Sequence, residues 1–241
     1  MRWGIFADVH GNLEAWQAVR KAYKKEGIDQ YICLGDLVGY GANPAECIAE
    51  IRKISSVIIA GNHDWAAVDL FDADYFNPQA KQAVVWTGQN LSAEDKQFLK
   101  GLRLVYQQEE LTLVHGSLSN CAQFEYIMDV ASAAETFAIL KSQICFIGHS
   151  HVPVVFIKQG QDLSHSLDPK IKLESAKTYI VNVGSVGQPR DANPQAAYAV
   201  YDSENKTLEI KRTPYNIKKA QEKIVRAGLP QILAERLAIG R

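Results

Sequence analysis

The chain has 241 residues, a length that fits one large domain or two small ones. Lys and Arg number 26 and Asp and Glu number 27, so the formal net charge is -1 and extensive binding of duplex nucleic acid through many phosphates is not expected. Hydrophobic residues make up 47% and charged residues 22% of the chain, which excludes a mainly disordered protein.

The first third of the chain alternates predicted strands with predicted helices. Strands are expected at residues 3–7, 31–34 and 57–60, where short apolar runs occur. Helices are expected at residues 13–25 and 44–54, the second with a proline near its first turn. A longer helical region is expected at residues 78–99, broken near Gly88 and restarted at Ser92, where Ser-x-x-Asp resembles a capping box.

Strands dominate the rest of the chain. They are expected at residues 111–114, 144–147, 152–157, 179–183, 197–201 and 207–212. The polar stretch 160–176 predicts an exposed hairpin tip or loop, and residues 217–239 predict two short helices separated by Gly228-Leu229-Pro230. Because only the early strands alternate with helices, we expect one domain with a mixed sheet or two sheets packed face to face between helices.

Neither a leader segment nor a disulfide framework is expected. The apolar run at residues 3–7 is too short for a signal peptide, and no stretch approaches the length of about 18 apolar residues typical of a membrane span. No C-x-x-C pair occurs among the four scattered cysteines, which are Cys33, Cys47, Cys121 and Cys145. We therefore expect a reduced, cytoplasmic protein that has no membrane association.

Metal-ligand side chains gather at the ends of predicted strands. Five of the six histidines follow an apolar run directly, and they are His10, His63, His115, His149 and His151. Asp8, Asp36 and Asn62 occupy equivalent positions. Because the carboxyl ends of strands in layered α/β sheets share one rim, we expect these eight side chains to converge.

The individual motifs differ in strength. Asp8-Val9-His10 alone is as well explained by a turn aspartate beside a surface histidine, and Gly35-Asp36 by a helix N-cap. The segment 61–64, Gly-Asn-His-Asp, indicates more, and the segment 148–151, Gly-His-Ser-His, is the strongest, because two imidazoles on a turn seldom serve packing alone. Imidazole with carboxylate suits Mn, Fe, Zn, Co or Ni, and the lack of cysteine there argues against a structural zinc site.

At these residues the sequence resembles the calcineurin-like metallophosphoesterase family, whose ordered signature is D-x-H, G-D, G-N-H-D/E, H and G-H-x-H. The resemblance extends from Asp8 to about Asp202 and is strongest toward a small bacterial and archaeal branch of predicted phosphodiesterases, through segments 35–41 and 182–191. It implies an α/β fold: a two-sheet β-sandwich flanked by helices in four αββα layers. Residues 1–213 would form the catalytic domain, and residues 214–241 a C-terminal helical extension of it.

The resemblance also implies a dinuclear centre that binds two divalent ions, with Mn the first expectation. One ion would be held by Asp8, His10 and His151, and the other by Asn62, His115 and His149. Asp36 would bridge the two, because a carboxylate has two oxygens to share. A hydroxide bridging ions about 3.5–4 Å apart would then attack phosphorus in line.

Two residues are predicted to act on the substrate rather than on metal. His63 matches the family's non-ligand histidine, which protonates the leaving group or stabilises transition-state charge. Arg190 could clamp a phosphate oxygen through its guanidinium fork, although a surface arginine paired with Asp191 explains it equally well. Tyr40, Asn12 and Phe76 are further candidates for the cleft, each with an ordinary packing or turn explanation.

The sequence also departs from one branch of the family. Protein serine/threonine phosphatases and the related symmetrical diadenosine tetraphosphate hydrolases contain G-D-x-V-D-R-G, whereas segment 35–41 here is Gly-Asp-Leu-Val-Gly-Tyr-Gly. The usual acidic partner of His63 and a phosphate-binding arginine are therefore missing, which makes both activities less expected without excluding them.

Taken together, these features predict a metal-dependent phosphoesterase that acts on a diester or another small phosphoester or nucleotide. The alternatives are a catalytically silent protein-interaction scaffold on the same fold and a nuclease of short oligonucleotides, and a homo-oligomer is also open. All seven expected ligands and His63 are present, which favours an enzyme over a scaffold.

Overall fold

Successive side chains of the first strand point to opposite faces of the sheet, so they pack into two different apolar layers. The computed structural model describes residues 1–241, and in it β1 (Arg2–Phe6) alternates the faces that it presents. Ile5 belongs to a buried cluster that contains residues of both sheets, whereas Phe6 packs with Trp16 and Tyr23 of helix α1 (Leu13–Tyr23). A buried strand of this kind, apolar on both faces, requires cover on each side.

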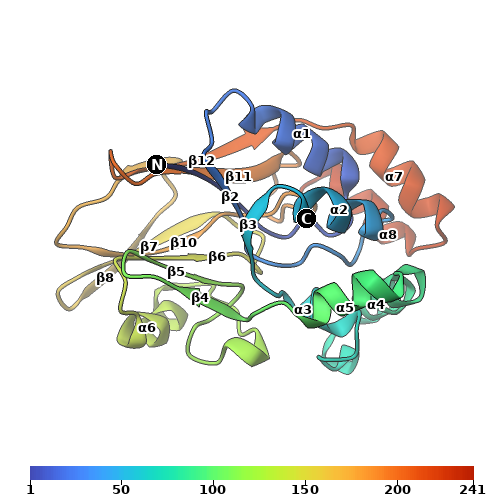
Figure 1. The fold of residues 1–241 in the computed structure, drawn as a ribbon, viewed down its shortest axis with the longest axis horizontal. Helices are drawn as coiled ribbons and strands as arrows, with labels where there is room; N and C mark the ends of the chain where they lie inside the picture. The colour runs from blue at the N-terminus through green and yellow to red at the C-terminus, as the bar shows by residue number, and fades with distance from the viewer.

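Two mixed sheets of six strands each provide this arrangement (Figure 1). The first sheet has the order β3-β2-β1-β11-β12-β9, with β3 at Ser55–Ile58, β2 at Gln30–Cys33, β11 at Ala196–Asp202, β12 at Thr207–Thr213 and β9 at Lys170–Lys172. The second has the order β4-β5-β6-β10-β7-β8, with β4 at Val105–Gln107, β5 at Leu111–Val114, β6 at Ile144–Ile147, β10 at Thr178–Asn182, β7 at Val154–Gln159 and β8 at Asp162–Ser166. Strands β1, β2 and β3 are mutually parallel, as are β5, β6 and β10.

Helices cover the outer faces of the two sheets. Helices α1 and α2 (Pro44–Arg52) lie against the first sheet, and α6 (Val130–Ile139) lies against the second. A third group comprises α3 (Asn62–Ala66), α4 (Pro78–Asn90) and α5 (Ala93–Lys100), and a last group comprises α7 (Ile217–Arg226) and α8 (Gln231–Glu235). Short 3-10 helices occur at Ala73–Tyr75, Cys121–Gln123 and Arg236–Ala238. The expected fold, a two-sheet sandwich between helices, is confirmed.

Some boundaries differ from the prediction. The helical region expected at 78–99 divides at Leu91 rather than near Gly88, because Gly88 continues α4 where the helix passes close to Ala67; a Cβ on Gly88 would lie 2.7 Å from the Ala67 carbonyl oxygen. Ser92 caps α5 as expected, accepting the Asp95 N–H at 3.1 Å. The polar stretch 160–176 contains strands β8 and β9, and β8 forms the expected hairpin with β7.

The C-terminal helices pack against the loop that follows β2. Tyr40, which follows β2, is buried in one apolar cluster with Leu233, Ala234 and Leu237. Ala80 and Ala83 of α4 belong to the same cluster. Residues 214–241 therefore contribute to the core around the Tyr40 loop instead of extending away from the fold, as Figure 1 also shows for α7 and α8.

Candidate metal centre

The parallel strands end at one edge, and the expected ligands meet there. Asp8 and His10 follow β1, Asp36 follows β2, and Asn62 begins α3, the helix that comes after β3. His115 follows β5, and His149 and His151 follow β6. All seven side chains are at most 5% exposed. The fold therefore gathers in one buried site residues as distant in sequence as Asp8 and His151, which are 143 positions apart.

Unusual backbone conformations aim these side chains at one another. Asp8, His10, Asp36, His149 and His151 all have φ between 50° and 68°, the left-handed region that non-glycine residues seldom occupy. Such strain concentrates at functional sites, where the surrounding structure holds it. Two glycines permit the close approach: a Cβ on Gly61 would lie 2.0 Å from Asp36 Oδ1, and one on Gly148 would lie 2.7 Å from Asp8 Oδ2.

The ligand atoms form two groups that share Asp36. In the first, donor atoms of Asp8, His10, Asp36 and His151 lie within 4.8 Å of one another; in the second, those of Asp36, His115 and His149 do. Asp36 Oδ2 is 3.5 Å from His10 Nε2 and 3.3 Å from His115 Nε2, so one oxygen stands between the two groups. Asp36 is the geometric centre of the site.

Backbone carbonyls fix the orientation of three imidazoles. The Nδ1 atom of His10 lies 3.0 Å from the Val38 oxygen, that of His115 lies 2.7 Å from Leu34, and that of His151 lies 2.6 Å from Gln188. A carbonyl only accepts, so each Nδ1 must donate its proton, and each Nε2 keeps a lone pair. This arrangement is the one that orients histidines toward a metal ion.

Several buried side-chain atoms that could bind a metal ion have no hydrogen-bond partner within the protein. Asp36 Oδ2, Asn62 Oδ1, His115 Nε2 and His149 Nε2 form no hydrogen bond, and a buried polar atom without a partner is costly. The Nε2 atoms of His10 and His151 face each other at 3.0 Å although both must present lone pairs. A cation between these groups would satisfy them all, so the residues present fit divalent metal ions.

The electrostatics favour neutral rings for three of the four ligand imidazoles. Burial lowers the pKa of His10, His149 and His151 well below the usual value, so these rings are unprotonated ligands. Burial raises the pKa of Asp36, but attraction to the neighbouring imidazoles, His115 above all, outweighs burial and holds that pKa below its ordinary value. In return Asp36 and Asp8 raise the pKa of His115 to about 9 against the effect of burial, so in the protein alone His115 shares a proton with this carboxylate pair. Burial raises the pKa of Asp8 to about 8, a cost that a bound cation would offset.

His63 lies beside this centre in an aromatic enclosure. Its ring stacks on Phe76 at 4.6 Å, contacts the Tyr40 ring at 4.4 Å and meets His10 edge-on at 4.8 Å. Its Nδ1 is buried without a partner, and a Cβ on Gly39 would lie only 2.4 Å from it. Burial lowers the pKa of His63 to about 4. Stacking and steric contact therefore orient this ring in place of a carboxylate.

Asp64, the next acidic residue, does not contact His63. Its carboxylate accepts the backbone N–H groups of Gly61 at 3.0 Å and Asp36 at 2.8 Å, and those of Leu37 at 2.8 Å and Val38 at 3.3 Å. Asp64 thereby ties the start of α3 to the loop that presents Asp36. It shapes the site through the backbone, as a buried anion surrounded by amide donors.

Arg190 is joined to the residues around this centre and does not pair with Asp191. Its Nη2 donates to Tyr40 Oη at 3.2 Å and to Gln188 Oε1 at 2.9 Å. Its backbone N–H donates to the His151 carbonyl at 3.2 Å. Asp191 forms an ion pair with Arg212 instead. Arg190 is therefore not a surface arginine paired with Asp191, and its action on the substrate stays a prediction.

Of the other cleft candidates, Tyr40 and Phe76 contact His63, but Asn12 has a structural role. Asn12 caps α1 by accepting the Ala15 N–H at 3.1 Å, and its amide donates to the Gly187 carbonyl at 2.8 Å. Sequence reasoning missed Tyr126, whose ring stacks on His149 at 3.8 Å while half of the residue stays exposed. Tyr126 lies in an irregular loop far from any motif, so no periodicity indicated it.

Comparison with known proteins agrees with this geometry. The model of the calcineurin-like phosphoesterase superfamily domain matches residues 1–206. An uncharacterised protein of Methanocaldococcus jannaschii, MJ0912, is 38% identical over 242 aligned residues, covering 98% of this chain and 97% of that protein. This chain belongs to the calcineurin-like phosphoesterase superfamily.

Solved structures of related proteins share the whole fold. A metallophosphoesterase from Sphaerobacter thermophilus superposes with a TM-score of 0.87 at 36% identity, covering 100% of this chain and 99% of that one. The hypothetical protein PH1004 from Pyrococcus horikoshii superposes with a TM-score of 0.81 at 20% identity, covering 100% and 98%. The C-terminal helices lie within these full-length superpositions.

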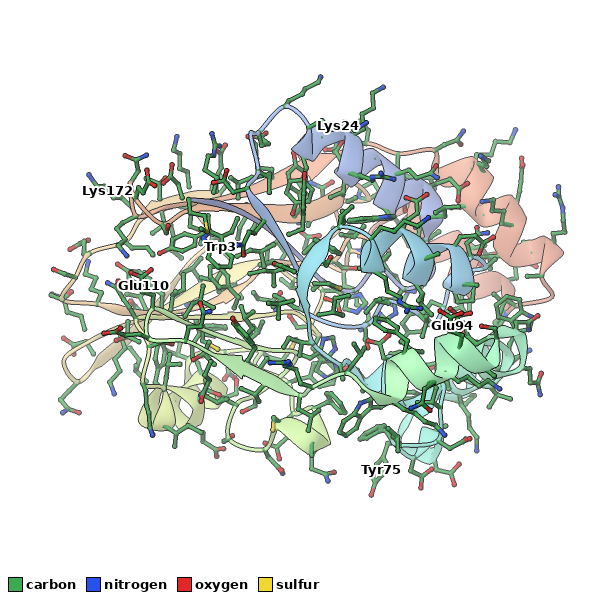
Figure 2. All side chains as sticks on the ribbon, viewed as in Figure 1. Trp3, Lys24, Tyr75, Glu94, Glu110 and Lys172 are labelled. Atoms are coloured by element: carbon green, nitrogen blue, oxygen red, sulfur yellow. The ribbon has the colours of Figure 1, made fainter.

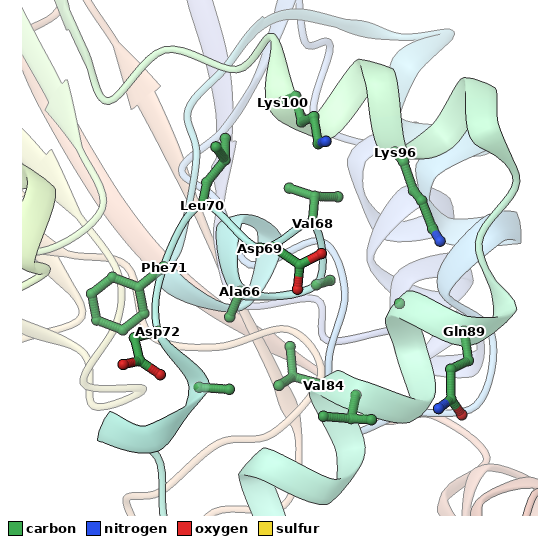
Figure 3. Close-up of a pocket in the computed structure, with 14 residues that line it drawn as sticks. Ala66, Val68, Asp69, Leu70, Phe71, Asp72, Val84, Gln89, Lys96 and Lys100 are labelled. Carbon is green, nitrogen blue, oxygen red and sulfur yellow. The ribbon is translucent and has the colours of Figure 1, made fainter.

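One cavity of this phosphoesterase-family chain is separate from the metal-ligand groups. It measures about 680 Å³ and is enclosed by helix α4, helix α5 and the segment that follows α3 (Figure 3). Val68, Val84 and Ala66 form apolar walls, and Lys96 and Lys100 extend from α5 at its rim. Tyr75, in the segment between α3 and α4, points away from the molecule and is 75% exposed (Figure 2).

None of the helices of this family member is both long enough and apolar enough to cross a membrane.

Proposed function

We propose that this member of the calcineurin-like phosphoesterase superfamily is a phosphodiesterase that uses two divalent cations. The observation that supports this most is the set of buried, unpartnered donor atoms on Asp36, Asn62, His115 and His149 around one carboxylate oxygen. One cation would be held by Asp8, His10 and His151 and the other by Asn62, His115 and His149, with Asp36 shared. Mn²⁺ is our first expectation among Mn, Fe, Zn, Co and Ni.

Bound divalent cations would supply Lewis-acid activation of water and of the phosphoryl group. The protein itself contributes rigidity, because the Nδ1 hydrogen bonds of His10, His115 and His151 leave each imidazole one orientation. It also shields the site from bulk solvent, since every ligand side chain is buried. In the overall reaction water adds to phosphorus and the ester oxygen leaves with a proton.

Arg190 and His63 would act on the substrate. Arg190 is half-buried above the ligands and uses Tyr40 and Gln188 to hold its guanidinium, which would bind a non-bridging phosphate oxygen. His63, held by Phe76 and Tyr40, would donate a hydrogen bond or proton to the leaving oxygen. Because burial lowers the pKa of His63, the neutral imidazole would act on the leaving oxygen by donating a hydrogen bond from its N–H group.

A diester or nucleotide fits this site better than a phosphoprotein. The segment Gly39-Tyr40-Gly41 replaces the D-R-G of the protein phosphatases, and Tyr40 is packed by the C-terminal cluster. Protein phosphatase and dinucleoside polyphosphate hydrolase activities stay the alternatives. A cytoplasmic location also stays a prediction.

The decisive experiment compares metal-stripped and Mn²⁺-reconstituted protein on bis(p-nitrophenyl) phosphate and on p-nitrophenyl phosphate. We expect reconstitution to restore cleavage and the diester to be the better substrate. In Asp36→Asn the shared oxygen loses its charge, so turnover should fall about 10²–10⁴-fold and the bound metal should decrease. Metal content by mass spectrometry and initial rates measure both effects.

Asp69→Asn is the matched control, because Asp69 is exposed and contacts no ligand. It should retain wild-type rates and metal content. If the wild-type protein binds two metal ions per chain and yet cleaves neither ester nor a panel of nucleotides, the scaffold alternative replaces our proposal.

A further inference from the structure

One of the four ligand imidazoles is oriented differently from the other three. The rings of His10, His115 and His151 each place Nδ1 against a main-chain carbonyl. The ring of His149 has no such carbonyl, and its buried Nε2 is also without a partner. Only its backbone is held, because the His149 N–H donates to the Asp8 carboxylate at 3.1 Å. Another contact must therefore set the direction of the His149 ring.

The ring of Tyr126 supplies this contact. Its centroid lies 3.8 Å from that of His149, with 17° between the two planes, so the rings are stacked. The terminal torsion of a histidine has only broad preferences of its own. A ring lying face-on against the imidazole restricts rotation about this torsion, which is the motion that would turn Nε2 of His149 away from a metal ion.

The loop that carries Tyr126 is anchored beside the second ligand group. The Glu125 carbonyl accepts the Ser117 N–H at 2.9 Å, and Ser117 lies two positions after His115. Phe124 is 3% exposed and packs edge-on against the His115 ring at 5.9 Å. Tyr126 itself is 50% exposed, so the loop fixes it from a buried base, and its removal would leave no large hole in a core.

The two ligand groups therefore differ in how their imidazoles are held. Carbonyl hydrogen bonds hold both imidazoles of the first group, His10 and His151. In the second group a carbonyl holds His115 alone, and His149 depends on Tyr126. A contact that orients a metal ligand typically changes metal affinity about 10–100-fold. Loss of the Tyr126 ring should then weaken the binding of one cation and leave the other unchanged.

We infer that Tyr126 is a positioning residue for the second cation, and that its ring acts through His149 to set the affinity of that ion alone. This inference rests on the two-cation centre of the proposed function. The hydroxyl of Tyr126 has a different neighbour. Burial raises the pKa of Tyr126, and Arg190 opposes the rise through its charge and through hydrogen bonding. The ring and the hydroxyl can therefore be tested separately.

The test titrates metal-free protein with Mn²⁺ by isothermal calorimetry. Tyr126→Ala should weaken the binding of one of two ions about 10-fold or more and change the other by less than about 2-fold. Tyr126→Phe keeps the ring and should bind both ions as the wild-type protein does. Tyr75→Ala removes a ring that is 75% exposed and contacts Phe71 rather than a ligand, and it should also bind both ions normally. Equal Tm values of the metal-free proteins confirm that each variant folds.

A double-mutant comparison shows whether Tyr126 acts through His149. His149→Gln keeps an amide oxygen that can bind a metal ion but has no ring to orient. It should weaken the same ion as Tyr126→Ala does, and Tyr126→Ala added to it should change that affinity by less than about 2-fold. A ring that only supports the loop would instead give two effects that add.

The outcomes separate this inference from the proposed hydrolysis. If Tyr126→Ala weakens both ions equally or neither, if Tyr126→Phe behaves like Tyr126→Ala, or if the two effects add, the inference is overturned while hydrolysis by the wild-type protein stands. If one ion depends on Tyr126 through His149 but neither aryl ester nor any nucleotide is cleaved, the positioning role stands and the proposed hydrolysis is wrong. Binding of fewer than two Mn²⁺ ions by the wild-type protein contradicts both.

Discussion

Glycine at position 39 is what allows His63 to occupy its place. Gly39 has φ +92°, a conformation that side chains rarely adopt, and its Cα faces the imidazole so closely that a Cβ would lie 2.4 Å from Nδ1. In the phosphatase branch this position is an aspartate that pairs with the histidine. Here Phe76 and Tyr40 hold the ring by aromatic contact, so the orientation of His63 depends on shape rather than charge.

We expect Gly39→Ala to displace His63 and to strain the loop. An alanine in the left-handed conformation should lower the unfolding free energy by about 1–2 kcal/mol. The clash with His63 should lower it by about 1–3 kcal/mol more. Turnover on the aryl diester should approach that of His63→Ala, about 10²-fold below wild type. Urea unfolding and initial rates test the two parts.

Gly160→Ala is the control that measures the backbone strain of a left-handed alanine without any steric clash. Gly160 has φ +61°, and a Cβ there would meet nothing within 4 Å. It should lose about 1 kcal/mol and keep full activity. Equal stability of the two variants, with wild-type turnover in Gly39→Ala, would contradict our account of His63.

At the scale of elements, the short helix α3 and the loop after β2 act as one unit. Asp64 accepts four backbone N–H groups from these two segments and is fully buried. The backbone N–H of His63 also donates to Asp36 Oδ1 at 2.9 Å. Asn62, His63 and Asp36 therefore keep their relative positions through main-chain hydrogen bonds.

Asp64→Asn should break this unit. The amide group presents a donor to N–H groups that need an acceptor, so at least one buried donor loses its partner and the unfolding free energy should fall by about 3 kcal/mol. Metal affinity should fall as well, because Asp36 and Asn62 are no longer held together. Isothermal titration with Mn²⁺ and urea unfolding measure these effects.

The exposed Asp69→Asn change serves again as the isosteric comparison and should alter stability by less than about 0.5 kcal/mol. Retention of wild-type stability and Mn²⁺ affinity by Asp64→Asn would show that the carboxylate is dispensable.

The ease of prediction also differed among elements. The strands that end in ligands were predictable, because uninterrupted apolar runs such as Ile144–Ile147 are followed directly by polar motifs. Strand β4, with three residues, and α6 were not predicted; α6 does begin with Asp129 and Ser132 in a capping box that could have indicated it. The ligand set was predictable from motif order, whereas the place of Tyr126 against His149 depends on tertiary packing between distant segments.

At the scale of the whole molecule, the C-terminal helices complete a core instead of forming a separate unit. Leu237 is 3% exposed in the cluster that also buries Tyr40, Ala80 and Ala83. That cluster joins three regions of the chain. We therefore predict that residues 214–241 unfold together with residues 1–213.

Leu237→Ala should lower the unfolding free energy by about 2–4 kcal/mol, because it leaves a cavity under Tyr40. Ile239→Ala, two residues away and 55% exposed, should change it by less than about 1 kcal/mol. Circular dichroism and tryptophan fluorescence should give one coincident transition for both proteins. Separate transitions would mean that the C-terminal helices form an independent unit.

The pairing of the first strand has a consequence for how the protein is made. Strand β1, which is followed by Asp8 and His10, lies between β2 and β11. In the antiparallel register of β1 and β11, Arg2 lies opposite Asp202. At a synthesis rate of roughly 5–20 residues per second, β1 waits roughly 10–40 s on the ribosome for its second neighbour. During that interval an apolar strand edge is open to other nascent chains, so we expect the first sheet to be complete only when translation is nearly finished.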